Sequence, residues 1–137
     1  IEELATPHVQ LIEAVPKTQI GDIFAAADVL LLHLRDDPLF AITIPSKAQF
    51  YMAMGRPILA GVRGEAAELV VGRGAGVVVA PQDVTAMAQG MVRMARLSSA
   101  ERARMGASAR AAYEADFSYR AGMEATTTCL NRPEFSR

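Results

Sequence analysis

The chain has 137 residues, 51% of them hydrophobic and 21% charged, which is enough to fill the core of one globular domain. Its formal net charge is −1 and its basic residues are scattered, so nucleic acid is not expected as a partner. Cys129 is the single cysteine, which excludes an internal disulfide and favours a reducing, cytoplasmic setting. The apolar runs are far shorter than the roughly 20 residues of a membrane-spanning helix, so any membrane association is expected to be peripheral.

The start of the chain has the character of an internal segment. It begins at Ile1 rather than at methionine, and the residues that follow resemble the end of a helix already under way. We therefore expect residues 1–137 to be a single partial domain that belongs to a longer protein.

Apolar runs alternate with short amphipathic segments in the first part of the chain. Residues 8–15 alternate enough to predict a short strand, which Pro16 ends. Residues 18–27 carry apolar side chains at helical spacing, and residues 29–34 form the unbroken apolar run of a strand covered on both faces. The segment 35–44, with two aspartates and a proline, is predicted to be a loop.

The next segments repeat the alternation of helix and strand. Pro45 at a first helical position and Gly55 after the last turn predict a helix over residues 45–54. A strand over 57–62, a helix over 64–73 and a strand over 76–80 follow.

The pattern beyond Pro81 is wholly helical. Asp83 is the candidate N-cap of one helix, a capping-box pattern at 98–101 begins a second that runs to about Ala115, and a third covers 119–130. The residues of the first helix that we expect to face the sheet are Val84, Met87, Ala88, Met91, Val92 and Ala95, with the stripe Met87, Met91 and Met94 as core packing.

The order of elements predicts the fold class. Strands alternate with helices four times, and each connection is long enough to cross over a sheet. We therefore predict an α/β fold with a Rossmann-like parallel sheet of about four strands, flanking helices and a helical C-terminal segment.

The loop that follows the second predicted strand is the first candidate for a binding site. Ligands of open parallel sheets bind at the carboxyl ends of the strands, and residues 35–47 form the longest and most polar loop there. The end of this loop brings backbone N–H groups, a hydroxyl and an ammonium to the positive end of a helix, which suits a diphosphate. The alternative is that this segment merely begins a helix and its lysine is solvated. The residues concerned are Thr43, Ile44, Pro45, Ser46 and Lys47.

Several short segments of the chain carry a family resemblance. They are FAAADVLLL at 24–32, IPSK at 44–47, YMAMGRPIL at 51–59, GEAAELV at 64–70 and GAGVVV at 74–79. Over roughly residues 8 to 130 the sequence closely resembles the C-terminal domain of retaining GT-B glycosyltransferases. The proline, serine and lysine before the helix are similar to the branch that transfers amino sugars in bacterial surface-polysaccharide synthesis.

The resemblance implies a function and a domain organisation. In that family the C-terminal domain holds a nucleoside-diphosphate sugar and the N-terminal domain holds the acceptor. The chain would then be the second half of a donor-binding domain, with a sheet portion over about 8–81 and a helical portion over 83–131. The implied enzyme is a hexosyltransferase-type glycosyltransferase that lacks its N-terminal acceptor-binding domain here, so the fragment alone is expected to be inactive.

The resemblance also implies the substrates. The donor would be a UDP-linked N-acetyl amino sugar, and the acceptor a lipid-linked sugar at the inner face of the cell membrane, for lipopolysaccharide or another surface polysaccharide. No metal and no other cofactor is implied, because such enzymes stabilise the leaving diphosphate with helix dipoles and basic side chains. Lys47 is the candidate catalytic charge.

One part of the family pattern is missing from this sequence. A pair of glutamates contacts the donor in the family, and counting back from Gly55 places them at Ile42 and Phe50, which cannot accept hydrogen bonds. Either the donor is held differently, which we favour, or the domain has lost activity. The residues expected to serve instead are Thr43, Ser46 and Lys47, with Gln49 and Phe50 on the ribose or base side and Arg63 and Gly64 lining the cleft.

Other readings stay open at the level of sequence. His33 is either a polar group at a strand end or a base, and Asp36 and Asp37 are either turn formers or a carboxylate pair. The chain could also be part of a UDP-sugar 2-epimerase, or a non-catalytic nucleotide-binding remnant. A partial domain leaves a sheet edge open, so self-association into a homo-oligomer is expected as well.

Overall fold

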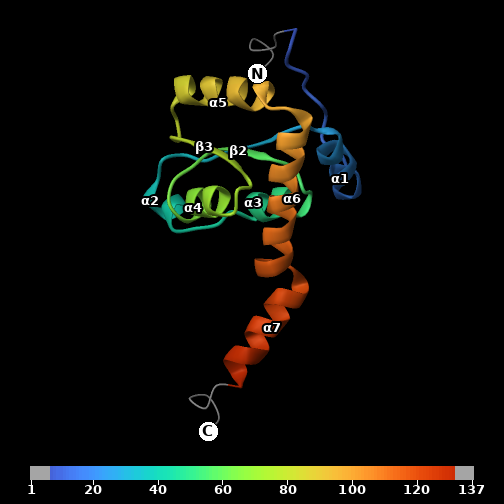
Figure 1. The fold of residues 1–137 in the computed structure, drawn as a ribbon, viewed down its shortest axis with the longest axis vertical. Helices are drawn as coiled ribbons and strands as arrows, with labels where there is room; N and C mark the ends of the chain where they lie inside the picture. Colours follow the sequence, from blue (N-terminus) through green and yellow to red (C-terminus); the bar gives the residue numbers. More distant parts are fainter. Residues whose placement is uncertain (1–6, 132–137) are drawn as a thin grey trace.

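Three parallel strands form the centre of the molecule, between helices on both faces (Figure 1). The computed structural model describes residues 7–131. Its elements are α1 (Lys17–Ala26), β1 (Leu30–His33), α2 (Pro38–Ala41), α3 (Ser46–Ala53), β2 (Ile58–Gly61), α4 (Glu65–Gly72), β3 (Gly76–Val79), α5 (Val84–Arg96), α6 (Ser99–Asp116) and α7 (Tyr119–Leu130).

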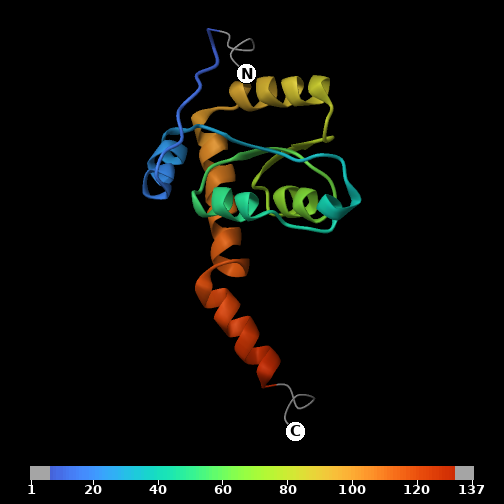
Figure 2. The ribbon, with the colours of Figure 1, turned by 180° about the vertical axis from the view of Figure 1, so that it is seen from behind.

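The sheet has the strand order β1-β2-β3, and both pairs are parallel. Side chains of successive residues point to opposite faces of a strand, so each face of this sheet has its own core. Leu30 and Leu32 of β1 belong to a larger cluster with α3, α4 and α6, whereas Leu59 and Val77 belong to a smaller one with Met94 of α5. Figures 1 and 2 show α5 on one side of the sheet and α3 and α4 on the other. This arrangement confirms the predicted α/β fold with a parallel sheet.

The strand predicted at residues 8–15 is wrong, and the sheet of the described residues has three strands rather than about four. Residues 9–16 have no regular secondary structure, and Val9, Leu11 and Ile12 are exposed. A strand is stabilised by hydrogen bonds to a neighbouring strand as well as by its apolar side chains. Alternating hydrophobicity depends only on the side chains, so it predicted a strand in a segment that pairs with no strand of the described sheet.

The loop predicted at 35–44 contains the one-turn helix α2. Its N-cap is Asp37, whose carboxylate accepts a hydrogen bond from the Leu39 amide at 2.9 Å. The helix α3 begins one residue later than predicted, at Ser46, so Pro45 is its N-cap rather than its first helical residue. Both differences are shifts at element boundaries, which a periodic pattern of side chains locates poorly.

The predicted C-terminal helices are confirmed, together with their caps. Asp83 accepts a hydrogen bond from the Ala86 amide at 2.8 Å, and Ser98 and Glu101 form the capping box that begins α6. Figures 1 and 2 show α6 crossing from the α5 layer to the α3 layer and α7 extending away from the sheet. Within residues 7–131, no helix is long and apolar enough to span a membrane.

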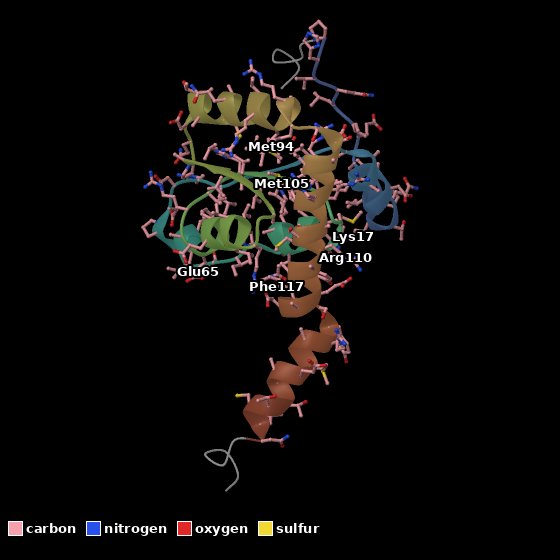
Figure 3. All side chains as sticks on the ribbon, in the orientation of Figure 1. Lys17, Glu65, Met94, Met105, Arg110 and Phe117 are labelled. Atoms are coloured by element: carbon pink, nitrogen blue, oxygen red, sulfur yellow. The ribbon has the colours of Figure 1, made fainter. Side chains whose placement is uncertain are left out.

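The face of α5 that packs on the sheet differs in part from the prediction. Met94 is buried and Met87 is partly buried, but Met91 and Val92 are each 49% exposed and Val84 is 83% exposed. The helix lies over β2 and β3, so Met91, which lines a hollow beside Leu31 of β1, has little to cover it, and Val92 is two residues from the buried Met94 and therefore points away from the sheet. Figure 3 shows Met94 close to Met105 of α6, where the two helices meet the sheet.

Candidate functional site

The carboxyl ends of the three strands form one edge of the molecule. Because the strands are parallel, the loops that follow β1, β2 and β3 leave from this edge. Figure 1 shows α2 there, together with the first turns of α4 and α5, while α1 lies on the opposite side. Figure 3 likewise shows Glu65, in the first turn of α4, and Lys17 of α1 on opposite sides of the molecule. Residues 35–47, which the sequence predicts to bind the donor and which we call the donor loop, and the loop at 62–64 therefore share this edge, the carboxyl edge.

Thr43 closes the donor loop through its own side chain. Its hydroxyl donates to the Leu39 carbonyl at 3.0 Å, so its single hydrogen is already used within the loop. Ile44 is partly buried against the larger core cluster and fixes the chain just before α3. Thr43 and Ile44 thus shape the loop, and the polar contacts to an anion would have to come from the residues that follow.

The start of α3 presents the polar groups that the sequence led us to expect. Pro45 is the N-cap, and Ser46 and Lys47 are exposed residues of the first turn. The Ala48 amide donates to the Pro45 carbonyl at 2.9 Å, but the amides of Ser46 and Lys47 come too early in the helix to have an intrahelical acceptor. Two backbone donors, a hydroxyl and an ammonium therefore occupy one turn at the positive end of a helix.

Gln49 and Phe50 lie one turn further along α3. Gln49 is half-buried, and Phe50 is 41% exposed. The Phe50 and Tyr51 rings both make edge contacts with Phe24 of α1, at centroid distances of 5.6 and 5.3 Å. Burial raises the pKa of the Tyr51 hydroxyl. Phe50 is thus shared with the α1 side, and only part of its ring is left for a ligand.

Arg63 and Gly64, in the loop after β2, lie beside the donor loop. Gly64 has φ +64 and is the N-cap of α4, and a β-carbon on it would come within 1.9 Å of the Ala41 carbonyl oxygen. The Arg63 guanidinium pairs with the Asp36 carboxylate at 3.4 Å. The loop after β2 therefore meets the loop after β1 at two points, by a close backbone approach and by an exposed ion pair.

The two positions where the family resemblance places glutamates are occupied by apolar side chains in different settings. Ile42 follows α2 and is 73% exposed, whereas Phe50 contacts Phe24. Neither side chain can accept a hydrogen bond from a sugar hydroxyl.

The sequence did not reveal the contact between the ends of β1 and β3. The Gln82 amide donates to Nε2 of His33 at 3.1 Å, and the Gln82 side-chain oxygen accepts from the Asp36 amide at 2.8 Å. His33 is thus a polar group at a strand end, and Asp36 and Asp37 serve separate roles in the loop. Gln82 lies 46 and 49 residues from its partners, so only the parallel order of the strands could have indicated the contact.

Two hollows of the surface lie beside α5 rather than at the start of α3. One of about 480 Å³ is lined by Val29, just before β1, and by residues of β1, β2, α5 and α6, among them Leu31 and Met91. A second of about 320 Å³ lies at the carboxyl edge between His33, Gln82 and Met87. Residues 7–131 contain no group of three or more histidine, cysteine, aspartate or glutamate side chains that could hold a metal ion.

Comparison with known proteins agrees with the fold and assigns a family. The structure is similar to sucrose-phosphate synthase from Thermosynechococcus elongatus, with a TM-score of 0.66 and 24% sequence identity, over 83% of this chain and 27% of that one. The chain therefore spans about a quarter of that enzyme, and its fold is that of a GT-B glycosyltransferase domain. No curated protein sequence is similar enough to count as a match.

The family model described as "Glycosyl transferases group 1" matches residues 1–96. This range contains all three strands and the helices α1 to α5 that surround them. The chain belongs to the group 1 glycosyl transferases.

Proposed function

We propose that this chain is the second half of the donor-binding domain of a longer GT-B glycosyltransferase, and that it binds the diphosphate of a nucleotide sugar at the start of α3. The observation that carries the proposal is the exposed first turn of α3, where Ser46 and Lys47 add a hydroxyl and a cation to unpaired helix amides. Peptide dipoles and orphan amides at a helix start attract anions, and a lysine beside them adds a full charge. The family membership makes a sugar diphosphate the expected anion.

Lys47 would act on the transition state as well as on binding. When the glycosidic bond to the diphosphate breaks, negative charge builds up on the leaving phosphate oxygen, and a fixed cation there lowers the barrier. Arg63 is suited to a second charge, because its side chain is 61% exposed and its ion pair with Asp36 is a surface contact. Such pairs are weak, so the guanidinium can turn toward a diphosphate at little cost.

The remaining donor contacts follow from the loop. Thr43, Ile44 and Pro45 give the turn its shape, and the Gly64 backbone closes it from the side of α4. Gln49 and the exposed part of Phe50 would meet the ribose or base. The donor sugar is proposed to be a UDP-linked N-acetyl amino sugar, held without acidic contacts at positions 42 and 50.

The rest of the enzyme is part of the proposal too. The chain spans 27% of the sucrose-phosphate synthase chain, and β1 is an edge strand of the described sheet, which leaves room for further strands of the same domain. A separate N-terminal domain would bind the acceptor, a lipid-linked sugar at the inner face of the cell membrane. The product would enter lipopolysaccharide or another surface polysaccharide, and the enzyme would work in the cytoplasm without a metal ion.

The experiment that tests the donor site is a calorimetric titration of this chain with UDP, UDP-N-acetylglucosamine and GDP-mannose. Binding of the UDP compounds at about 1 mM or tighter, with weaker binding of the GDP compound, is the expected result. Failure of all three to bind would contradict the proposal for this chain. Incubation with the UDP sugar then separates the transferase from a 2-epimerase, because an epimerase changes the sugar without any acceptor.

A further inference from the structure

Gln82 has an unusual backbone conformation at the carboxyl edge. Its φ is +59°, and it is the one residue other than glycine with positive φ among residues 7–131. Side chains disfavour this left-handed region, so a glutamine there has to be held by its surroundings. Residues of this kind gather at functional sites.

Gln82 joins two parts of the chain that the sheet alone leaves separate. Its amide donates to His33 Nε2 at 3.1 Å, which ties the turn after β3 to the last residue of β1. Its side-chain oxygen accepts from the Asp36 amide at 2.8 Å, which ties the same turn to the beginning of the donor loop. β1 and β3 are not neighbours in the sheet, since β2 lies between them. This His33–Gln82–Asp36 bridge therefore spans the whole carboxyl edge.

The imidazole of His33 is placed to receive the Gln82 amide. A β-carbon on Gly61 would lie 2.8 Å from Cδ2 of His33 and 2.7 Å from the terminal methyl carbon of Met87, so the ring fits over the bare backbone of β2 beside Met87. Because Nε2 accepts a hydrogen bond, the neutral ring must carry its proton on Nδ1. Leucine has a similar size but no acceptor, whereas the oxygen of glutamine can lie near the position of Nε2.

We propose that His33 and Gln82 are positioning residues for the donor loop, an inference that rests on the proposed function of that loop. The bridge fixes Asp36, whose neighbour Asp37 caps α2. At its other end α2 meets Gly64, and Ser46 begins α3 after the four intervening residues 42–45. The amides that bind the diphosphate are thus placed by a chain of contacts that begins at Gln82, although neither His33 nor Gln82 touches the donor.

The test compares four variants of this chain by amide exchange and by UDP titration. His33→Leu removes the acceptor of the Gln82 amide, and Gln82→Gly removes the acceptor of the Asp36 amide while keeping a backbone suited to positive φ. His33→Gln is the conservative variant, and His8→Leu makes the same chemical change at an exposed histidine outside the sheet. A long-range nitrogen–proton spectrum of the unmodified chain reports which ring nitrogen of His33 carries the proton.

We expect faster exchange of the Asp36 amide in His33→Leu and Gln82→Gly, and a UDP affinity about three- to tenfold weaker, which is the scale of one hydrogen bond. His33→Gln and His8→Leu should retain the affinity, and the spectrum should place the His33 proton on Nδ1. If Gln82→Gly and His33→Leu bind UDP as His8→Leu does, or if the proton is on Nε2, the inference is wrong while the donor site stands. If the unmodified chain binds no nucleotide, the donor site itself fails.

Discussion

The backbone of Gly64 lies against the carbonyl oxygen of Ala41, with no space for a side chain between them: a β-carbon on Gly64 would lie 1.9 Å from that oxygen. This approach fixes the end of α2 against the start of α4. Ile42 to Pro45 then lead directly to the exposed first turn of α3. The relative position of two loops at the carboxyl edge thus depends on a residue without a side chain.

Gly64→Ala is expected to destabilise the fold and to displace the donor loop. Gly64 has φ +64 and ψ −140, close to a region that almost only glycine adopts, so alanine there costs about 1–3 kcal/mol, and overpacking against the Ala41 carbonyl should add about 1–3 kcal/mol. Gly74→Ala is the matched control, because Gly74 has φ +61 but open space around its α-carbon. Urea unfolding of the two variants measures the difference, and equal losses of unfolding free energy would show that the contact with Ala41 is not formed.

The capping box of α6 predicts a pH-dependent contribution to stability. Hydrogen bonds from the Ser98 hydroxyl, at 2.6 Å, and from the Ser98 amide, at 2.8 Å, lower the pKa of Glu101 below its ordinary 4.5. A lowered pKa in the folded state means that this stabilisation is present above pH 4.5 and is lost as the pH falls through the lowered value.

Ser98→Ala should therefore raise the pKa of Glu101 toward its ordinary value. An NMR titration of the Glu101 carboxyl carbon measures this change. Ser99→Ala, which changes a neighbouring serine outside the capping box, should leave the Glu101 pKa where it is. A Glu101 pKa that is the same in both variants would contradict the account.

The open edge of the sheet predicts self-association. In the described sheet β1 pairs with β2 alone, and Leu31 is 45% exposed beside the hollow of about 480 Å³. Unpaired strand edges and apolar hollows favour contacts with other chains. Sedimentation velocity should show species larger than the monomer, and Leu31→Glu should reduce them. Leu130→Glu, at an exposed leucine of α7, should not. A chain that is monomeric at every concentration contradicts this prediction.

Much of the fold could be predicted from the sequence because its signals are local. The caps of α5 and α6 depend on residues three positions apart, and the buried strands are short apolar runs. The strand expected at residues 8–15 and the exposed Met91 show the limit. The spacing of apolar residues indicates which side chains can be buried together. Which strand or helix buries them depends on the tertiary structure.

The candidate site was predictable only in part, for the same reason. Pro45, Ser46 and Lys47 stand together in the sequence, so their meeting at the start of α3 could be expected. The bridge from His33 through Gln82 to Asp36 joins residues far apart in the chain, and positive φ at a glutamine has no sequence signature. The closeness of Arg63 to Asp36 likewise follows from the order of the strands.

The most direct test of the donor site compares the two lysines of the chain. Lys47 and Lys17 are both exposed, and each lies in the first turn of a helix whose N-cap is a proline, but Lys17 is on α1, away from the carboxyl edge (Figure 3). Titration of UDP into Lys47→Ala should show an affinity about tenfold weaker than that of the unmodified chain, while Lys17→Ala should bind as the unmodified chain does. If the two variants bind UDP equally well, the start of α3 is not the diphosphate site.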